Sequence, residues 1–319
     1  MALEPKQLMH LAMIAGHGSF SRAAAAMNIS QPALSSSMAA LERTIGARVL
    51  DRGRHGAKVT EIGSALVRHA HALQSQLAHA VEEAHLKKLG GEGPLKIGVT
   101  PATAANLVPQ ALGRLHRENP NISVSIQEGV LDEAMTALHI GEVDVVVGPI
   151  AIYPAARDLI EEPLVSDPLS VVIRAQHPLA SLRSISLKNL RDVSWALPSE
   201  RSAFRRQLEA LFVTAGVQWP TLCLTTNSMT ALKSIVLNSD AITIMPRRLI
   251  ALESEARRLA CVRLRDTGRE RMLGMTWSRR RGLSPLAERF LTLLREIAAE
   301  EKKAPTRIAR RSRGGGPAR

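Results

Sequence analysis

The chain has 319 residues, of which 45% are hydrophobic and 22% charged, and its formal net charge at pH 7 is +13. This length suits two or three domains rather than one. No run of about 18 apolar residues occurs, so we predict no membrane span, and the first residues lack the basic and apolar regions of a secretory signal. The two cysteines, Cys223 and Cys261, form neither a disulfide framework nor a CxxC metal motif. We therefore expect two buried thiols in a reducing cytoplasm.

The positive charge is concentrated at the ends of the chain. Residues 1–60 carry 7 Lys and Arg against 3 Asp and Glu, and residues 301–319 carry 7 against 1, whereas the 240 residues between them carry 28 against 25. This distribution favours a nucleic-acid-binding N-terminus. Residues 301–319 lack hydrophobic periodicity, so we predict a disordered basic tail that adds either phosphate affinity or only solubility.

The first sixty residues have the pattern of a helix-turn-helix. Apolar residues at helical spacing predict a helix over 5–15, and an alanine-rich second helix over 20–27 follows a possible cap at Ser19. Ser30 is a natural cap for a third helix, and Pro32 falls in its first turn, where a missing N–H costs nothing. The third helix is the element that would enter the major groove of DNA.

A basic hairpin follows this third helix. Residues 52–58 contain three basic residues and two glycines, and the hairpin closes at Val59 and Thr60, of which Thr60 can cap a further helix. Helices at a tight turn followed by a basic hairpin predict a winged helix-turn-helix over residues 1–60. The hairpin would be the wing, which lies along the DNA backbone or in the minor groove.

These residues resemble the DNA-binding pattern of the LysR-type transcriptional regulator family. The matching residues, in order, are Gly18 to Ala24, Ser30 to Ser35, Leu41, Glu42, Gly46, Arg52 and Thr60 to Gly63. The resemblance implies that Gln31, Pro32 and Ser35 contact DNA in the groove and that Arg52 anchors the protein near the wing. We expect double-stranded DNA as a partner and the following DNA-binding residues: Ser21, Arg22, Ser30, Gln31, Pro32, Ser35, Ser36, Arg52, Arg54 and Lys58.

The chain departs from the family at the recognition helix. Where the family often has a larger polar or basic residue, this chain has Ser36, followed by Ser37, and we expect both to face outward. Short hydroxyls cannot make the bidentate guanine contact of an arginine, so the wing and DNA shape would carry more of the specificity. The alternative is that each serine only solvates the helix surface.

Residues 60–90 predict a long linking helix. Apolar residues recur at alternating intervals of four and three, and a 29-residue helix would extend roughly 43 Å. Such a stripe has no evident partner within its own chain, so we predict dimerisation through it, and the family resemblance implies a homotetramer. The histidines on this helix lack metal-ligand spacing, so we expect no metal site, and residues 89–94 should form a hinge. The stripe consists of Leu66, Ala70, Leu73, Leu77, Ala80 and Ala84.

From residue 94 to about 300 the chain alternates predicted strands and helices. Strands over 95–99, 122–126 and 143–147 are separated by helices over 107–119 and 131–140, which predicts a parallel sheet covered by helices. A second set of alternating elements predicts a second lobe. The fold class is therefore α/β, a periplasmic-binding-protein-like (type 2) effector domain behind the winged helix-turn-helix. We place lobe one at about 94–163 and 272–300 and lobe two at about 164–271, and the LysR resemblance covers about 5–300.

The predicted effector site lies in the crevice between these lobes. Ligands of open α/β sheets bind beyond the carboxyl ends of strands, where helix starts offer N–H groups. Hydroxyl and amide side chains at four such positions favour a small anionic metabolite, although each is also a common helix cap. The candidate effector-binding residues are Thr100, Pro101, Ala102, Thr103, Gly148, Ser199, Thr225, Thr226 and Asn227.

Other functional classes fit the sequence less well. It has no Walker A, HExxH or GxSxG motif, so we predict neither an enzyme nor a bound cofactor. A solute-binding transport protein would share the effector fold but would need an export signal and would lack the helix-turn-helix. A ligand-independent architectural DNA-binding protein remains the main alternative. We therefore predict a metabolite-controlled, cytoplasmic DNA-binding regulator.

Overall fold

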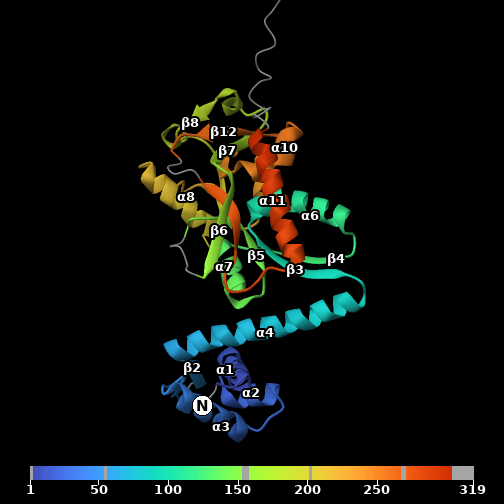
Figure 1. Ribbon diagram of the computed structural model, residues 1–319. Coiled ribbons are helices and arrows are strands. Elements are labelled where there is room, and N and C mark those ends of the chain that lie inside the picture. Colours follow the sequence, from blue (N-terminus) through green and yellow to red (C-terminus); the bar gives the residue numbers. More distant parts are fainter. Residues whose placement is uncertain (1–2, 54–55, 153–157, 201–202, 267–270, 304–319) are drawn as a thin grey trace, which may run out of the picture. The chain divides into compact units, whose positions relative to one another are not determined.

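The computed structural model describes residues 3–53, 56–152, 158–200, 203–266 and 271–303 (Figure 1). Arg54 and residues 304–319 of the predicted tail therefore lie outside the described residues. The chain forms two compact units. The first contains Met1–Lys96, Asn121–Ser125 and Met135–Asp144, and the second contains Ile97–Pro120, Ile126–Ala134 and Val145–Arg319.

The N-terminal helices and hairpin form as the sequence predicts. The Ser30 side chain accepts the backbone N–H of Ala33 at 3.3 Å, whereas Ser19 makes no side-chain capping bond. Leu11, Ile14 and Leu34 are fully buried at the centre of the core. The elements are α1 Pro5–His17, α2 Phe20–Ala26, α3 Gln31–Ile45, β1 Leu50–Gly53 and β2 Gly56–Val59 (Figure 1).

Two side chains fix the turn between α3 and the wing. The carboxylate of Glu42 accepts the backbone N–H groups of Val49 and Leu50, at 3.0 and 3.4 Å. The Thr60 hydroxyl caps the next helix by accepting the N–H of Gly63 at 3.0 Å, and it donates to the Arg48 carbonyl at 3.0 Å. These bonds tie the strands of the wing to the recognition helix.

The linking helix α4, Glu61–Lys88, corrects one expectation. Its first apolar positions do have a partner in the same chain, because Leu66 and the fully buried Ala70 pack against Leu8 and Ala12 of α1. Farther along, Leu77 is 59% exposed, so this later part of the helix leaves apolar surface for another chain. The predicted hinge is also shorter than expected, because a strand already begins at Glu92.

Lobe one is built on a five-stranded sheet with the strand order β4-β3-β5-β13-β6. Strands β3 and β5 are parallel, as predicted, but β13 runs antiparallel to both β5 and β6. The sheet is therefore mixed, because β6 leaves the lobe and β13 returns to it. The strands are β3 Glu92–Val99, β4 Ile122–Glu128, β5 Val145–Pro149, β6 Leu159–Ser166 and β13 Met272–Ser278. The helices are α5 Pro101–Ala104, α6 Leu107–Glu118, α7 Leu131–Ile140 and α11 Pro285–Lys303.

Lobe two has a four-stranded sheet in the order β11-β7-β12-β8 and a parallel pair, β9 and β10. Both β11 and β12 run antiparallel to β7, whereas β12 and β8 are parallel, so this sheet is mixed as well. Trp195 and Phe212 pack edge to face in its core, with ring centroids 5.5 Å apart. The strands are β7 Leu169–Arg174, β8 Ser184–Ile185, β9 Trp195–Pro198, β10 Cys223–Thr226, β11 Thr243–Pro246 and β12 Leu259–Leu264. The helices are α8 Ala203–Thr214, α9 Met229–Leu237 and α10 Ala251–Glu255, with 3-10 turns η1 Pro178–Ser181, η2 Leu187–Asn189 and η3 Arg247–Ile250.

The close approach of α4 to the wing gives a test of this packing. A Cβ atom on Gly63 would collide with the carbonyl oxygen of Val49, whereas nothing lies within 4 Å of a Cβ on Gly16. Gly63→Ala should therefore destabilise the N-terminal domain by about 1–3 kcal/mol, and Gly16→Ala should not, because alanine favours a helix over glycine. Calorimetric unfolding of the full chain measures both, and equal melting curves would contradict the packing described.

Candidate DNA-binding surface and effector site

The predicted DNA-reading residues gather at the start of α3. Gln31, Pro32 and Ser36 are exposed, and Ser35 is half-buried. The Ser21 hydroxyl donates to the side-chain oxygen of Gln31 at 3.3 Å, so α2 helps to orient this glutamine. The structure thus brings together the start of α2 and the start of α3, the two helices of the helix-turn-helix motif.

The structure describes only some of the side chains of the remaining predicted DNA-binding residues. Arg22 and Lys58 are exposed, and Ser30 uses its hydroxyl as a cap. The backbone of Arg52 lies in β1, but its side chain and all of Arg54 fall outside the description. Their contribution to DNA binding stays a prediction.

Ser37 does not face outward as expected. It is half-buried, and its hydroxyl lies 2.7 Å from Nδ1 of His10, which is only 5% exposed. Burial, and to a lesser extent the charge of Lys6, lowers the pKa of His10. Ser37 of the recognition helix therefore serves the contact between α1 and α3.

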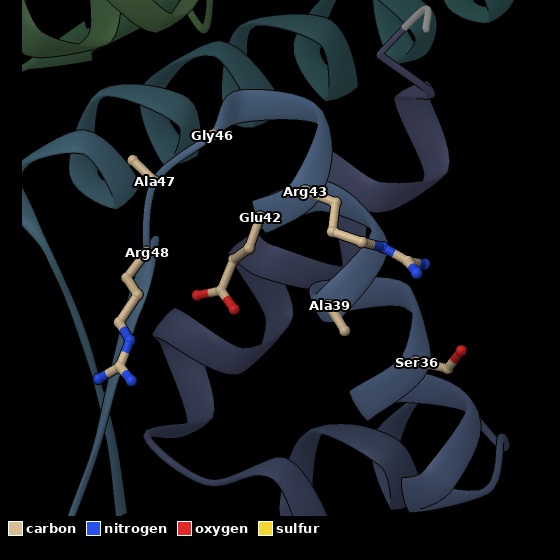
Figure 2. A pocket seen from close by; sticks show the side chains of 7 residues that line it. All are labelled: Ser36, Ala39, Glu42, Arg43, Gly46, Ala47 and Arg48. Carbon is tan, nitrogen blue, oxygen red and sulfur yellow. The ribbon is translucent and has the colours of Figure 1, made fainter.

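A groove beside the end of the recognition helix was not predicted. Its cavity volume is about 560 Å³, and Figure 2 shows its lining side chains. Arg43 and Arg48 are exposed and lie on different sides of it. The helical spacing of Ser36, Ala39 and Arg43 was the available signal, because these positions share one helix face. The lining residues are Ser36, Ala39, Glu42, Arg43, Gly46, Ala47 and Arg48.

In lobe one, the predicted effector residues form a compact turn after β3. Thr100 is 6% exposed and Thr103 is fully buried. The Thr103 hydroxyl lies 2.6 Å from the Val147 carbonyl and accepts the N–H of Thr100 at 3.2 Å, so it is occupied within the lobe. A Cβ atom on Gly148 would come within 3.1 Å of the Thr100 side chain, which explains why a glycine stands there.

The short helix α5 within this turn packs against lobe two. Ala102 is 2% exposed and belongs to a cluster with Val172, Leu232 and Ile250, all of lobe two. It is therefore an interlobe packing residue, and Pro101 begins the same helix. Thr100, directly before α5, lies at the edge of this contact.

In lobe two, Ser199 and Thr225 line one cavity of about 580 Å³. The Arg205 guanidinium lies 3.9 Å from the ring centroid of Trp219 and donates to Glu209 at 2.6 Å. Sequence reasoning missed this arginine and tryptophan, because no motif links residues 14 positions apart on separate elements. The cavity is lined by Ser199, Glu200, Arg205, Trp219, Pro220, Thr221, Cys223 and Thr225.

The other lobe-two candidates sit at the start of α9. Thr226 accepts the N–H of Ser228 at 3.1 Å, which is an ordinary local turn, and Asn227 is exposed. The convergence of all four predicted segments on one crevice stays a prediction.

Cys223 and Cys261 are free and half-buried rather than buried, and burial raises the pKa of the Cys261 thiol to about 11.

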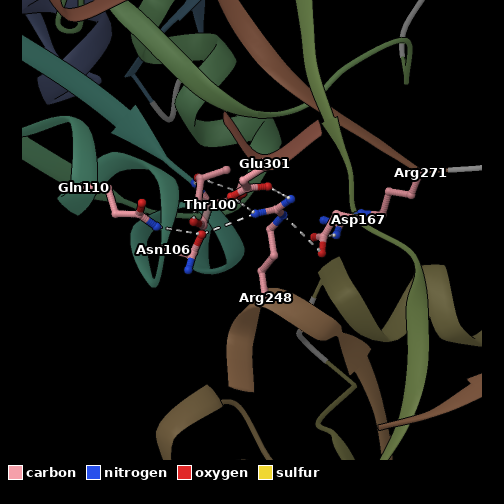
Figure 3. A network of polar contacts seen from close by, with 8 residues as sticks. Thr100, Asn106, Gln110, Asp167, Arg248, Arg271 and Glu301 are labelled. Atoms are coloured by element: carbon pink, nitrogen blue, oxygen red, sulfur yellow. Dashed lines mark hydrogen bonds and ion pairs between the residues drawn. The ribbon is translucent and has the colours of Figure 1, made fainter. Parts of the chain in front are cut away.

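A polar network joins the two crossings between the lobes (Figure 3). Arg271, directly before β13, donates to the fully buried Asp167, between β6 and β7, at 2.8 Å. Burial raises the pKa of the Asp167 carboxyl and lowers that of the Arg271 guanidinium, since each charge loses hydration. Arg248 of η3 donates to both oxygens of Glu301 on α11, at 2.9 and 2.6 Å.

Comparisons with known proteins agree with this architecture. The family model of the bacterial regulatory helix-turn-helix protein, lysR family, matches residues 5–64, and that of the LysR substrate binding domain matches residues 89–299. The chain is 32% identical to the SDS degradation transcriptional activation protein of Pseudomonas sp. (strain ATCC 19151), over 96% of this chain and 99% of that protein. It is 29% identical to the HTH-type transcriptional regulator GbpR of Azospirillum brasilense, over 93% and 87% of the two chains.

The fold is also that of solved LysR structures. The crystal structure of CbnR, a LysR family transcriptional regulator, matches with a TM-score of 0.60 at 20% identity and covers 93% of this chain and 99% of that chain. A winged helix-turn-helix followed by a two-lobed α/β domain defines a DNA-binding transcriptional regulator with a substrate-binding domain. The chain belongs to the LysR family, which confirms the resemblance and the fold class predicted from its sequence. Among the helices of the described residues, none is long and apolar enough to cross a membrane.

The buried His10 makes the stability of the N-terminal domain depend on pH. Because its pKa is lowered on folding from 6.5, the folded domain binds fewer protons than the unfolded chain near that pH. Its stability is thus fully present above about pH 6.5 and falls as the pH drops through and below this value. We expect hydrogen exchange of the α1 and α3 amides, corrected for intrinsic rates, to show this loss.

His10→Gln should reduce this pH dependence, since glutamine keeps polar atoms near Ser37 but does not titrate. His69→Gln, at an exposed position of α4, is the matched control and should keep the wild-type dependence. An unchanged slope in His10→Gln would contradict the role given to this histidine.

Proposed function

We propose that this LysR-family regulator binds DNA as a homo-oligomer and changes its mode of binding when a small anionic metabolite occupies the crevice between its lobes. The protein acts in the cytoplasm and catalyses no reaction. The observation that carries the proposal is the pairing of an exposed recognition surface, around Gln31 and Ser36, with a domain whose two lobes meet at Ala102, two residues after Thr100. Domain closure around a ligand is a common way to bias one of two arrangements.

The chemistry near the lobes supports an anion. Thr100, Ser199 and Thr225 offer hydroxyl groups, and the Arg205 guanidinium, whose side chain is 11% exposed, keeps N–H donors beyond the one that it gives to Glu209. Carboxylates bind such groups through charge-assisted hydrogen bonds. Thr103 and Thr226 contribute less, because their hydroxyls are already used within their own segments.

The later part of α4 supports the oligomer. Leu77 and Val81 are 59% and 72% exposed, four positions apart on one helix. Apolar side chains at this spacing form a stripe that another helix can cover. A ligand-independent architectural DNA-binding protein would need the same stripe but would have no use for a response at Thr100.

Thr100→Val separates these two functions. The substitution replaces a hydroxyl with a methyl group of similar size, so the fold and the DNA affinity should persist. We expect at least one acid from a panel of small mono- and dicarboxylic acids to raise the melting temperature of the wild type and change its DNase footprint. The midpoint of that response should move at least about tenfold in Thr100→Val, the equivalent of about 1.4 kcal/mol from a lost hydrogen bond to a charged group.

Thr214→Val is the control, because the Thr214 hydroxyl is exposed and bonds only to its own helix at Ala210. It should respond as the wild type does. A wild type that ignores every acid, while binding DNA, would favour the architectural alternative. An unaltered midpoint in Thr100→Val would remove Thr100 from the effector site.

A further inference from the structure

Several arginines of the second unit have a carboxylate partner, whereas the described basic residues of the N-terminal domain have none. In the second unit, Arg114, Arg271 and Arg295 each pair with a carboxylate. Among the described residues of the N-terminal domain, the basic side chains make no ion pair. An exposed cation without an acidic neighbour keeps its charge available for a partner. These unpaired residues are Lys6, Arg22, Arg43, Arg48 and Lys58.

Two of these cations border the groove at the end of α3. Arg43 leaves the last turn of the helix and Arg48 the loop before β1, on different sides of the groove in Figure 2. The groove also contains Glu42, but this carboxylate accepts two backbone N–H groups of the wing and is thereby stabilised in place. The free charge at the groove is therefore positive.

The position of Arg43 along the helix indicates what part of DNA it would meet. Residues at the start of a recognition helix contact base edges, and Arg43 lies eleven positions after Pro32 on the same face. That is about 16 Å along the axis, more than the roughly 12 Å width of the major groove. On a DNA duplex bound at the start of α3, Arg43 would therefore lie beyond the bases, beside the sugar-phosphate backbone.

We propose that Arg43 and Arg48 hold DNA phosphates at this groove and supply affinity that the short side chains of Ser35 and Ser36 do not. Phosphate contacts fix the register of a protein on DNA without reading its sequence. This inference rests on the proposed function and extends it to residues outside the wing and the start of α3.

The test compares Arg43→Ala and Arg48→Ala with Gln31→Ala in the full chain. Binding is measured by fluorescence anisotropy at several NaCl concentrations, on a duplex selected from random sequence by the wild type and on a scrambled duplex. Each arginine variant should weaken binding to both duplexes by a similar factor and reduce the salt slope by about one for each half-site that the oligomer occupies. Gln31→Ala should weaken mainly the selected duplex and keep the slope.

Arg191→Ala, at an exposed position of lobe two, is the control and should bind as the wild type does. Unchanged salt slopes in both arginine variants, with wild-type binding intact, would overturn this proposal and leave the proposed function standing. A wild type that binds neither duplex would overturn both.

A second observation concerns the contact between the lobes. Arg248 of lobe two donates to Asn106 and Glu301 of lobe one, at 3.3 Å for the first and 2.9 and 2.6 Å for the second. We name these three residues the interlobe clasp. The Arg248 Nε atom also faces Oδ1 of Asp167 at 3.9 Å, which is too long for a hydrogen bond.

Both of these facing atoms are buried, and neither has a hydrogen-bond partner among the described residues. An unmade hydrogen bond between buried polar groups costs free energy. A second arrangement, in which Arg248 moves toward Asp167 and loosens its hold on Glu301, would recover that bond at the expense of another. One guanidinium therefore has two competing acceptors, one on lobe one and one on the crossing between the lobes.

We infer that Arg248 is a positioning residue that sets the arrangement of the two lobes, with Glu301 holding the arrangement described here. Glu301 belongs to lobe one, whereas Asp167 lies on the crossing between the lobes. Exchange of Arg248 between these two acceptors therefore changes how firmly lobe two is held to lobe one. Two arrangements close in free energy are what a ligand needs in order to shift a population.

Two adjacent glutamates of α11 provide a matched pair of variants. Glu301 pairs across the lobes with Arg248, and Glu300 pairs within lobe one with Arg114, each through two oxygens. Glu301→Gln should increase hydrogen exchange in η3 and around Asp167 by several-fold, whereas Glu300→Gln should leave both segments unchanged. The measurement uses the full chain and needs no ligand.

Glu301→Asp, which restores the charge on a shorter side chain, should recover part of the protection. Equal exchange in the Glu301→Gln and Glu300→Gln proteins at these segments would overturn the clasp. So would increased exchange throughout lobe one in Glu301→Gln, because that result would indicate a general loss of stability.

Discussion

A buried ion pair holds together the two places where the chain crosses between the lobes. Asp167 lies just after β6 and Arg271 just before β13, and their side chains meet at 2.8 Å with the carboxylate fully buried. Removing one partner would leave an uncompensated buried charge, which is strongly destabilising. The ion pair therefore joins the two crossings, and Arg248 of lobe two faces Asp167 of this pair at 3.9 Å (Figure 3).

Much of the fold was predictable because its signals are local. The cap at Ser30, the cap at Thr60 and the helix over Leu131–Ile140 depend on neighbouring residues, and the structure contains all three. The contacts that were missed are long-range. The packing of Ala70 on α1 could not be read from a stripe that also fits a coiled coil, and Arg248 and Glu301 are 53 positions apart.

In the candidate sites, too, features with a local sequence signal were predictable and features that depend on long-range contacts were not. The start of the recognition helix was predictable from a spaced motif, whereas Arg43 and Arg48 belong to no motif and become related only through the fold of the loop that Glu42 holds. Likewise, the cavity at Trp219 depends on a side chain packed under Arg205. Among the predicted effector residues, Thr100 stands at the N-cap of α5, and the hydroxyls of Thr103 and Thr226 are used within their own segments.

The central claim is that a small-molecule ligand bound between the lobes changes how the N-terminal domain binds DNA. The most direct test is a DNase footprint of the full chain on a genomic fragment that it selects, with and without deproteinised small-molecule extract of its host cells. We predict a protected site with two half-sites separated by whole turns of the DNA helix, whose outer boundary shifts when the extract is added. A footprint that stays the same with every fraction of the extract would contradict the account.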